Sequence, residues 1–218
     1  SKINPVPLKR LGAGYHSLDT GTKLASATGI RTAMANKDNI SGLLPDNCLN
    51  IIKNHTTIEY NDFSTVLGSK LLSMDTLDHI EGINQDLSNR IANNKYNFTD
   101  IETFIPMLQS KNYTYSAISR ALLHIILDIK TDDIKEFVNN NYAMILGFTK
   151  KSGVLSEISK STKIPLVSKF ATFYKEADSN QRKMLDINLK ADNLYRMIYM
   201  NKTSETLPTE FQRQIIIK

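Results

Sequence analysis

The residues whose spacing most clearly suggests chemistry are Ser26, Thr28 and Arg31. Ser26 is a favourable helix N-cap, because its side-chain oxygen can accept a hydrogen bond from a free backbone N–H of the first turn. The apolar face that follows at helical spacing consists of Ile30, Ala33 and Met34. Thr28 and Arg31 then lie near the helix end that carries a partial positive charge. This pattern predicts a phosphate-binding helix start, although an ordinary capped helix with a solvated arginine fits the same spacing.

Four segments, in chain order, carry a resemblance to a known family. The run from Ser26 to Arg31 resembles the Ser-Ser/Ala-Thr-x-Ile-Arg motif of the HxGH nucleotidyltransferase superfamily, whose hydroxyls and arginine hold the triphosphate of ATP. With three further segments it resembles the tRNA(Met) cytidine acetate ligases of bacteria over nearly the whole chain. The four segments are Ala25–Met34, Lys111–Tyr115, Leu146–Gly153 and Ile164–Lys169.

The resemblance implies an activity, substrates and partners. Members of the family use ATP, as its magnesium complex, and acetate to make acetyladenylate. They then form N4-acetylcytidine at the wobble position of elongator tRNA(Met). Ser26, Thr28 and Arg31 are accordingly expected to bind ATP. Arg10 matches a family arginine beside the bound nucleotide, although an exposed arginine at a strand end would look the same.

The family's His-x-Gly-His motif is missing from this sequence. The four histidines are His16, His55, His79 and His124, and none stands in such a motif. The chain is therefore expected to be the C-terminal portion of a family member, with no catalytic residue of its own. The HxGH half is then its expected partner, and the fragment alone is expected to be inactive.

Basic and aromatic residues gather around the second segment. Lys111, Tyr113, Tyr115 and Arg120 lie within ten residues of one another. Cations can contact phosphates and aromatic rings can stack on unpaired bases, so these residues are candidate tRNA contacts. In the alternative, both tyrosines pack in the core and Arg120 pairs with an acidic residue.

Three lysines of the third and fourth segments, Lys150, Lys151 and Lys169, are further candidate tRNA contacts. The alternative is that they are surface lysines without a partner.

Composition narrows the class of protein. The 218 residues carry a net charge of +5, with a sequence pI near 9.1, which permits nucleic-acid binding without requiring it. One cysteine, Cys48, and four scattered histidines show no metal-ligand spacing, so no metal site is expected. No apolar run approaches the roughly 20 residues of a membrane span. We expect a cytoplasmic protein that does not contact a membrane.

The periodicity predicts a mainly α fold that positions these residues. Residues 1–37 are expected to form the last strand and helix of a Rossmann-like nucleotidyltransferase domain, with the strand near Pro5–Leu11. Residues 38–218 are expected to form a helical, tRNA-binding C-terminal domain. Its central helix is predicted at 114–129, and its final helix at 177–200 with a possible break at 184–191.

Smaller features of the helical part are also predicted. A helix should begin at His79, and Thr99–Glu102 resembles a capping box. The apolar runs at 142–147 and 164–167 form a small parallel pair of strands across one helix, or else belong to an all-helical arrangement. The isoleucines of the C-terminal tail predict that this tail docks.

Two other functions fit the sequence. One is a non-catalytic helical module that binds RNA or protein. The other is a nucleotidyltransferase of different specificity, against which the long helical part argues only by analogy.

Overall fold

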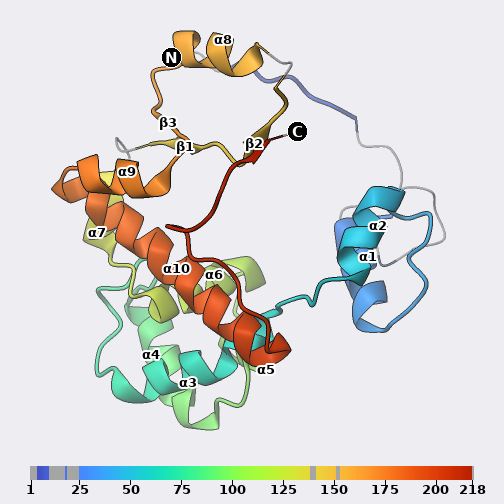
Figure 1. Cartoon of the computed structure of the whole chain (residues 1–218). Coiled ribbons are helices and arrows are strands. Elements are labelled where there is room, and N and C mark those ends of the chain that lie inside the picture. Colours follow the sequence, from blue (N-terminus) through green and yellow to red (C-terminus); the bar gives the residue numbers. More distant parts are fainter. Residues whose placement is uncertain (1–3, 10–17, 19–24, 138–140, 151–152, 218) are drawn as a thin grey trace. The chain divides into compact units, whose positions relative to one another are not determined.

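The computed structural model describes residues 4–9, 18, 25–137, 141–150 and 153–217. Two compact units, Ser1–Thr57 and Ile58–Lys218, make up the chain (Figure 1). The division falls later than the boundary at residue 37 that the sequence suggests. The reason is a small core that joins the segment after residue 37 to the helix before it.

The first unit contains two helices, α1 (Ala27–Ala35) and α2 (Asp46–Lys53). The buried residues of its core are Ala33, Ile40 and Leu49. Residues 4–9 form no strand among the described residues, and Val6 and Leu8 are 82% and 91% exposed. The strand expected there has no partner in the described part of the first unit, and a strand needs a neighbour to satisfy its backbone groups.

Helix α1 ends in a Schellman motif. Asn36 is the C-cap, the Lys37 N–H donates to Met34 O, and the Asp38 N–H donates to Ala33 O at 2.8 Å. Lys37 occupies the left-handed position of this motif, with φ of 62°, where glycine is the usual residue.

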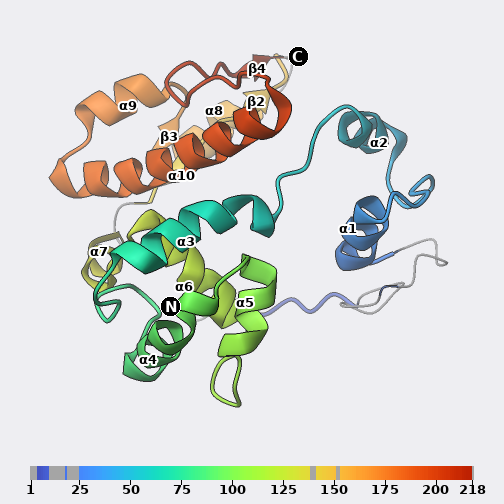
Figure 2. The ribbon, with the colours of Figure 1, turned by 90° about the horizontal axis from the view of Figure 1, so that it is seen from below.

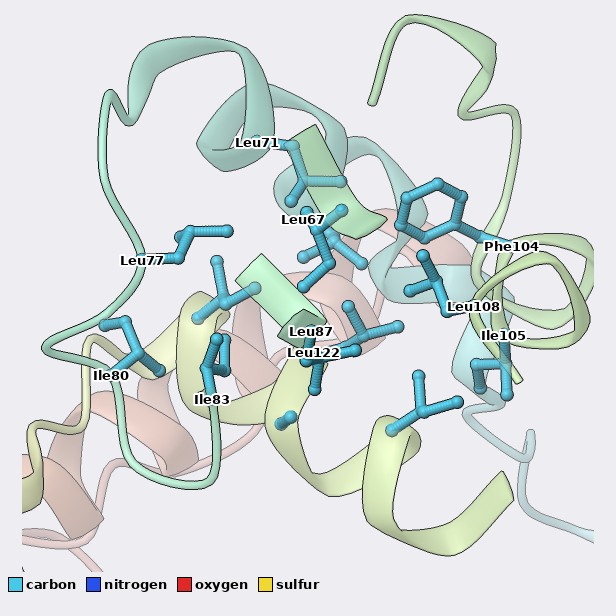
Figure 3. Close-up of a cluster of buried hydrophobic side chains, with 14 of the residues drawn as sticks. Leu67, Leu71, Leu77, Ile80, Ile83, Leu87, Phe104, Ile105, Leu108 and Leu122 are labelled. Atoms are coloured by element: carbon cyan, nitrogen blue, oxygen red, sulfur yellow. The ribbon is translucent and has the colours of Figure 1, made fainter. Parts of the chain in front are cut away.

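The core of the second unit is built by four helices. They are α3 (Ser64–Ser73), α4 (Gln85–Asn94), α5 (Ile101–Leu108) and α6 (Tyr115–Leu127). Figure 3 shows leucine, isoleucine and phenylalanine side chains from these helices converging on one cluster. Ile118, Leu122 and Ile125 of α6 are at most 1% exposed, which confirms the predicted central helix.

Helices α5 and α6 each begin one residue later than the sequence predicts. Thr114, the predicted first residue of α6, is its N-cap. The cap of α5 is Asp100, one residue after Thr99, and its side chain accepts from the Thr103 N–H at 2.9 Å. The helix predicted from His79 begins only at Gln85. Gly82, with φ of +79°, belongs to a turn that precedes this helix.

Short elements complete the second unit. They are η1 (Tyr60–Phe63), η2 (Lys95–Asn97), α7 (Thr131–Phe137), β1 (Ala143–Met144), β2 (Gly147–Phe148), α8 (Val154–Ser161), β3 (Leu166–Val167), α9 (Phe170–Glu176) and β4 (Ile216–Ile217). β1 pairs in parallel with β3, which confirms the predicted pair of strands and makes the all-helical arrangement wrong.

A second parallel pair, β2 with β4, docks the C-terminal tail. Gly147 permits the close approach, because a Cβ there would lie 2.8 Å from Ile216 O. The docking of the tail is confirmed, but Ile216 and Ile217 remain more than half exposed.

Helix α10 (Ser179–Thr203) runs without the break considered at 184–191. Asp178 and Gln181 form a capping box at its start. Ser204, with φ of 62°, ends it, and the following segment returns along the helix (Figures 1 and 2). Among the described residues, none of the helices combines the length and apolarity that crossing a membrane requires.

Candidate functional site

The start of α1 has the geometry that the sequence predicts for a capped helix. Ser26 is fully buried and its Oγ accepts a hydrogen bond from the Gly29 N–H at 2.9 Å. Its oxygen therefore serves the helix itself, which is the ordinary role of an N-cap.

Thr28 and Arg31 lie beyond this cap, three residues apart and thus on one side of the helix. Thr28 is half-buried and Arg31 is exposed. Arg31 forms no ion pair within the described residues, and the first turn of α1 contains no acidic side chain. A hydroxyl, a guanidinium and the positive end of the helix dipole can together bind a phosphate group. Arg10, the fourth candidate ATP contact, lies outside the described residues.

Tyr113 packs against the core and holds two parts of the second unit together. Its ring is half-buried against the core of the second unit, and its hydroxyl donates to Asn84 Oδ1 at 2.5 Å. Asn84 also caps α4 by accepting from the Leu87 N–H. Tyr113 thus joins the loop before α6 to the start of α4, while Lys111 in the same loop is exposed.

Tyr115 and Arg120 are exposed and line a shallow groove of about 310 Å³ on the second unit. We call it the tyrosine groove; its residues are Tyr60, Tyr115, Ser116, Ser119, Arg120 and Leu123. Arg120 forms no ion pair in the described part of the chain, so the predicted alternative of an acidic partner is wrong there. The groove joins two aromatic rings with a cation, which is the combination that binds unpaired bases and their phosphates.

Tyr60 lines the groove, but the sequence did not predict it as a candidate RNA contact. It lies on η1, which two neighbouring residues hold in place. The Asn61 side chain makes two hydrogen bonds with Glu102, one to its backbone N–H and one to its carboxylate, each 3.1 Å long. Asp62 accepts two bonds from Lys202 Nζ, at 2.8 and 2.9 Å.

Partial burial raises the pKa of the Tyr115 hydroxyl above its ordinary value, and the nearby Glu102 carboxylate and Tyr60 raise it further. The hydroxyl therefore stays protonated at neutral pH and can donate a hydrogen bond to a nucleic acid.

The remaining candidate lysines lie elsewhere. Lys150 follows β2 and Lys169 precedes α9, and both are exposed. Neither lines the tyrosine groove as the described residues define it. Lys151 lies outside the described residues.

His124 has a structural role. Its Nδ1 lies 2.7 Å from the Glu81 carbonyl oxygen, which ties α6 to the turn before α4.

Comparison with known proteins shows which proteins the chain is similar to. A family model described as HIGH Nucleotidyl Transferase matches residues 1–210. A tRNA(Met) cytidine acetate ligase of Thermoanaerobacter sp. (strain X514) is 32% identical over 211 residues, covering 93% of this chain and 52% of that protein. The enzyme of the same name from Clostridium acetobutylicum is 30% identical over 226 residues, covering 100% and 54%.

Two crystal structures of Thermotoga maritima TmcAL share the fold. The apo form has a TM-score of 0.83 at 21% identity, over 96% of this chain and 54% of that one. The form bound with alpha-thio ATP has a TM-score of 0.78 at 21% identity, over 90% and 53%.

The chain spans about half the length of the curated relatives it matches. Its resemblance to the tRNA(Met) cytidine acetate ligases extends over nearly all of its residues, as the four sequence segments predict. On the family match across residues 1–210, the chain belongs to the HIGH Nucleotidyl Transferase family.

Proposed function

We propose that this chain is part of an ATP-dependent ligase that activates acetate as acetyladenylate and forms N4-acetylcytidine in elongator tRNA(Met). The observation that carries the proposal is the similarity to enzymes named tRNA(Met) cytidine acetate ligase along 93% or more of the chain. The TmcAL structure with an ATP analogue supports ATP as the activating substrate.

The start of α1 suits the activation step. An acetate oxygen attacks the α-phosphorus of ATP, and the bond to the pyrophosphate leaving group breaks. Such a reaction needs positioned reactants and compensation of phosphate charge more than it needs a side-chain acid or base. In the proposal Arg31 supplies positive charge to the phosphates, and Thr28 and the helix N-terminus add hydrogen-bond donors.

The tyrosine groove suits the RNA substrate. A wobble nucleotide belongs to the anticodon loop, where bases are unpaired and can stack on aromatic side chains. Tyr60 and Tyr115 offer such rings, and Arg120 offers a cation for the backbone. Lys111, Lys150, Lys151 and Lys169 are proposed to add weaker contacts to phosphates.

We further propose that the chain is catalytically inactive without an HxGH half. The sequence contains no His-x-Gly-His, the motif that the family resemblance places in the other half. The reactive centre would then be completed by the partner half, with this chain supplying one wall of the ATP site.

The experiment is to join or mix this chain with the HxGH half of a relative and incubate it with ATP, magnesium, acetate and tRNA(Met). Mass spectrometry of the digested tRNA should find N4-acetylcytidine only when all components and both halves are present. Product without ATP or acetate, or acetylation of every tRNA alike, would contradict the proposal. Product from this chain alone would contradict the need for the other half.

A further inference from the structure

Lys202 is the residue of α10 that binds η1. Its Nζ donates to both carboxylate oxygens of Asp62, at 2.8 and 2.9 Å. The same carboxylate accepts a hydrogen bond from the Glu59 N–H at 2.7 Å. Asp62 therefore connects the start of η1 to a lysine that lies 140 residues further along the chain.

Tyr60 lies between two residues that are held by hydrogen bonds. On one side, the Glu59 N–H is bonded to Asp62. On the other side, the Asn61 side chain is bonded to the backbone N–H and the carboxylate of Glu102. Tyr60 is 39% exposed, and its hydroxyl forms no hydrogen bond among the described residues. The position of its ring therefore depends on the bonds of its neighbours.

Helix η1 needs these contacts because it is short and lies near the start of the second unit. It has four residues in 3₁₀ geometry, whose hydrogen bonds are poorer than those of an α-helix. The unit begins at Ile58, two residues before Tyr60. The ends of a compact unit are poorly ordered unless other contacts tie them down. The bonds to Lys202 and Glu102 are contacts of this kind.

The Tyr60 ring is part of the tyrosine groove, together with Tyr115 and Arg120. Tyr60 is close enough to Tyr115 to contribute to the raised pKa of that hydroxyl. Lys202 does not line the groove as the described residues define it. A ring that is already in place loses less conformational entropy when a base stacks on it, so its position affects affinity.

The bond between α10 and η1 matters more for this position than for stability. The side chains of Lys202 and Asp62 are 36% and 21% exposed, and ion pairs of such exposure stabilise a fold only weakly. We propose that Lys202 is a positioning residue for RNA binding, which acts through Asp62 to keep the Tyr60 ring in the tyrosine groove beside Tyr115. Lys202 does not itself contact the RNA. This inference rests on the proposed function, because it takes the groove to bind unpaired bases of an RNA substrate.

The test compares dissociation constants for tRNA(Met), measured by fluorescence anisotropy, between the wild-type chain and its variants. Lys202→Gln should weaken binding about three-fold, which is the order of the cost of ordering one side chain on binding. Lys202→Arg keeps the charge and the N–H donors and should restore most of the affinity. Lys160→Gln removes the same charge from an exposed position on α8 and should weaken binding less than Lys202→Gln.

Asp62→Asn separates positioning from a direct contact between Lys202 and the RNA. This substitution removes a negative charge and leaves the lysine in place. If Lys202 contacted a phosphate directly, Asp62→Asn would bind RNA as well as the wild type or better. Positioning predicts weaker binding, as for Lys202→Gln. In a Tyr60→Ala chain neither substitution should weaken binding further, because no ring is left to position.

NMR spectra without RNA measure the positioning itself. Lys202→Gln should shift the ring signals of Tyr60 and Tyr115 and leave those of the buried Phe104 unchanged. Unchanged Tyr60 signals, tighter binding by Asp62→Asn, or an equal loss in the Tyr60→Ala chain would overturn the inference. If the wild-type chain binds tRNA(Met) and Lys202→Gln binds equally well, only this inference fails. If the wild-type chain does not bind tRNA(Met), the proposed RNA role fails as well.

Discussion

Arg31 is the side chain on which the proposed ATP contact depends most directly. In an assembly with the HxGH half, Arg31→Ala should reduce ATP-dependent pyrophosphate release about ten-fold to a hundred-fold. The reason is the loss of a charge-assisted hydrogen bond worth roughly 1.5–3 kcal/mol. Pyrophosphate release with acetate as the second substrate is the measurement.

Arg31→Lys should retain part of this activity, because lysine keeps the charge but not the planar guanidinium. Lys37→Gln, an exposed substitution at the other end of α1, is the matched control and should leave the rate unchanged. Wild-type pyrophosphate release by Arg31→Ala would refute the assignment of Arg31 to the ATP site.

Tyr115 is the side chain on which the proposed RNA contact depends most directly. Tyr115→Ala should weaken tRNA(Met) binding about five-fold or more, because stacking of a base on an aromatic ring is worth roughly 1–3 kcal/mol. Tyr115→Phe keeps the ring and should bind nearly as well as the wild type. Dissociation constants from fluorescence anisotropy provide the test.

The control for Tyr115 is Tyr96→Ala. Tyr96 is 80% exposed but lies outside the tyrosine groove, so its loss should not change the dissociation constant. Equal weakening by both alanine variants would mean that any exposed tyrosine contributes and that the groove has no special role.

Local patterns predicted side chains whose position depends on one helix. Ser26 as an N-cap follows from its own helix, because its oxygen accepts from the Gly29 N–H three residues later. Tyr60 could not be predicted, because it reaches Tyr115 only through contacts between η1, α5 and α10 that no local spacing encodes.

Helix α1 can be stabilised by a substitution at its C-terminal end. Lys37→Gly should raise the stability of α1 by up to about 1 kcal/mol, because a non-glycine residue at positive φ is strained. Ala35→Gly, in the last helical residue, should instead lower it by about 0.5–1 kcal/mol. Hydrogen exchange of the α1 amides measures both, and a lower stability for Lys37→Gly would contradict the Schellman end.

The ion pair between Asp62 of η1 and Lys202 of α10 should make the stability of the fold depend on pH. Partial burial acts to raise the pKa of Asp62, but the Glu59 N–H and the Lys202 ammonium outweigh it, and the pKa lies below its ordinary 3.8. A carboxyl whose pKa is lower in the folded state stabilises the fold above the unfolded pKa. This stabilisation is lost as the pH falls through the folded pKa.

Asp62→Asn should therefore destabilise the chain at pH 7 but make less difference at pH 2 to 3, in urea unfolding at both pH values. A partly exposed pair of this kind is worth about 1 kcal/mol or less. Asp86→Asn, which removes the more exposed pair with Arg90, should have a smaller effect at pH 7. An Asp62→Asn penalty that grows as the pH falls would contradict the direction of the shift.

Helices with a strong apolar periodicity could be predicted from the sequence. Strands that pair with segments far away in the sequence were harder to predict. The apolar stripe of α6 and the parallel pair of β1 with β3 were both expected. The pairing of β2 with β4 was missed, because it joins short segments far apart in the sequence. The late start of α4 depends on Gly82, whose positive φ favours a turn in a stretch that looks helical.

At the scale of the whole molecule, the candidate sites divide between the two units. The described ATP-site candidates all lie in Ser1–Thr57, and the tyrosine groove lies in Ile58–Lys218. The curated relatives are about twice as long as this chain. We therefore propose that the second unit of this chain binds RNA, and we expect this binding to persist without the other half.

The most direct test is to measure binding of this purified chain to elongator tRNA(Met) and to an unrelated tRNA at two salt concentrations. We predict tighter binding to tRNA(Met) at both concentrations. We also predict weaker binding at the higher salt concentration for both RNAs, because phosphate contacts release counterions. Equal affinity for the two tRNAs, or no binding even at low salt, would contradict the claim that this chain recognises tRNA(Met).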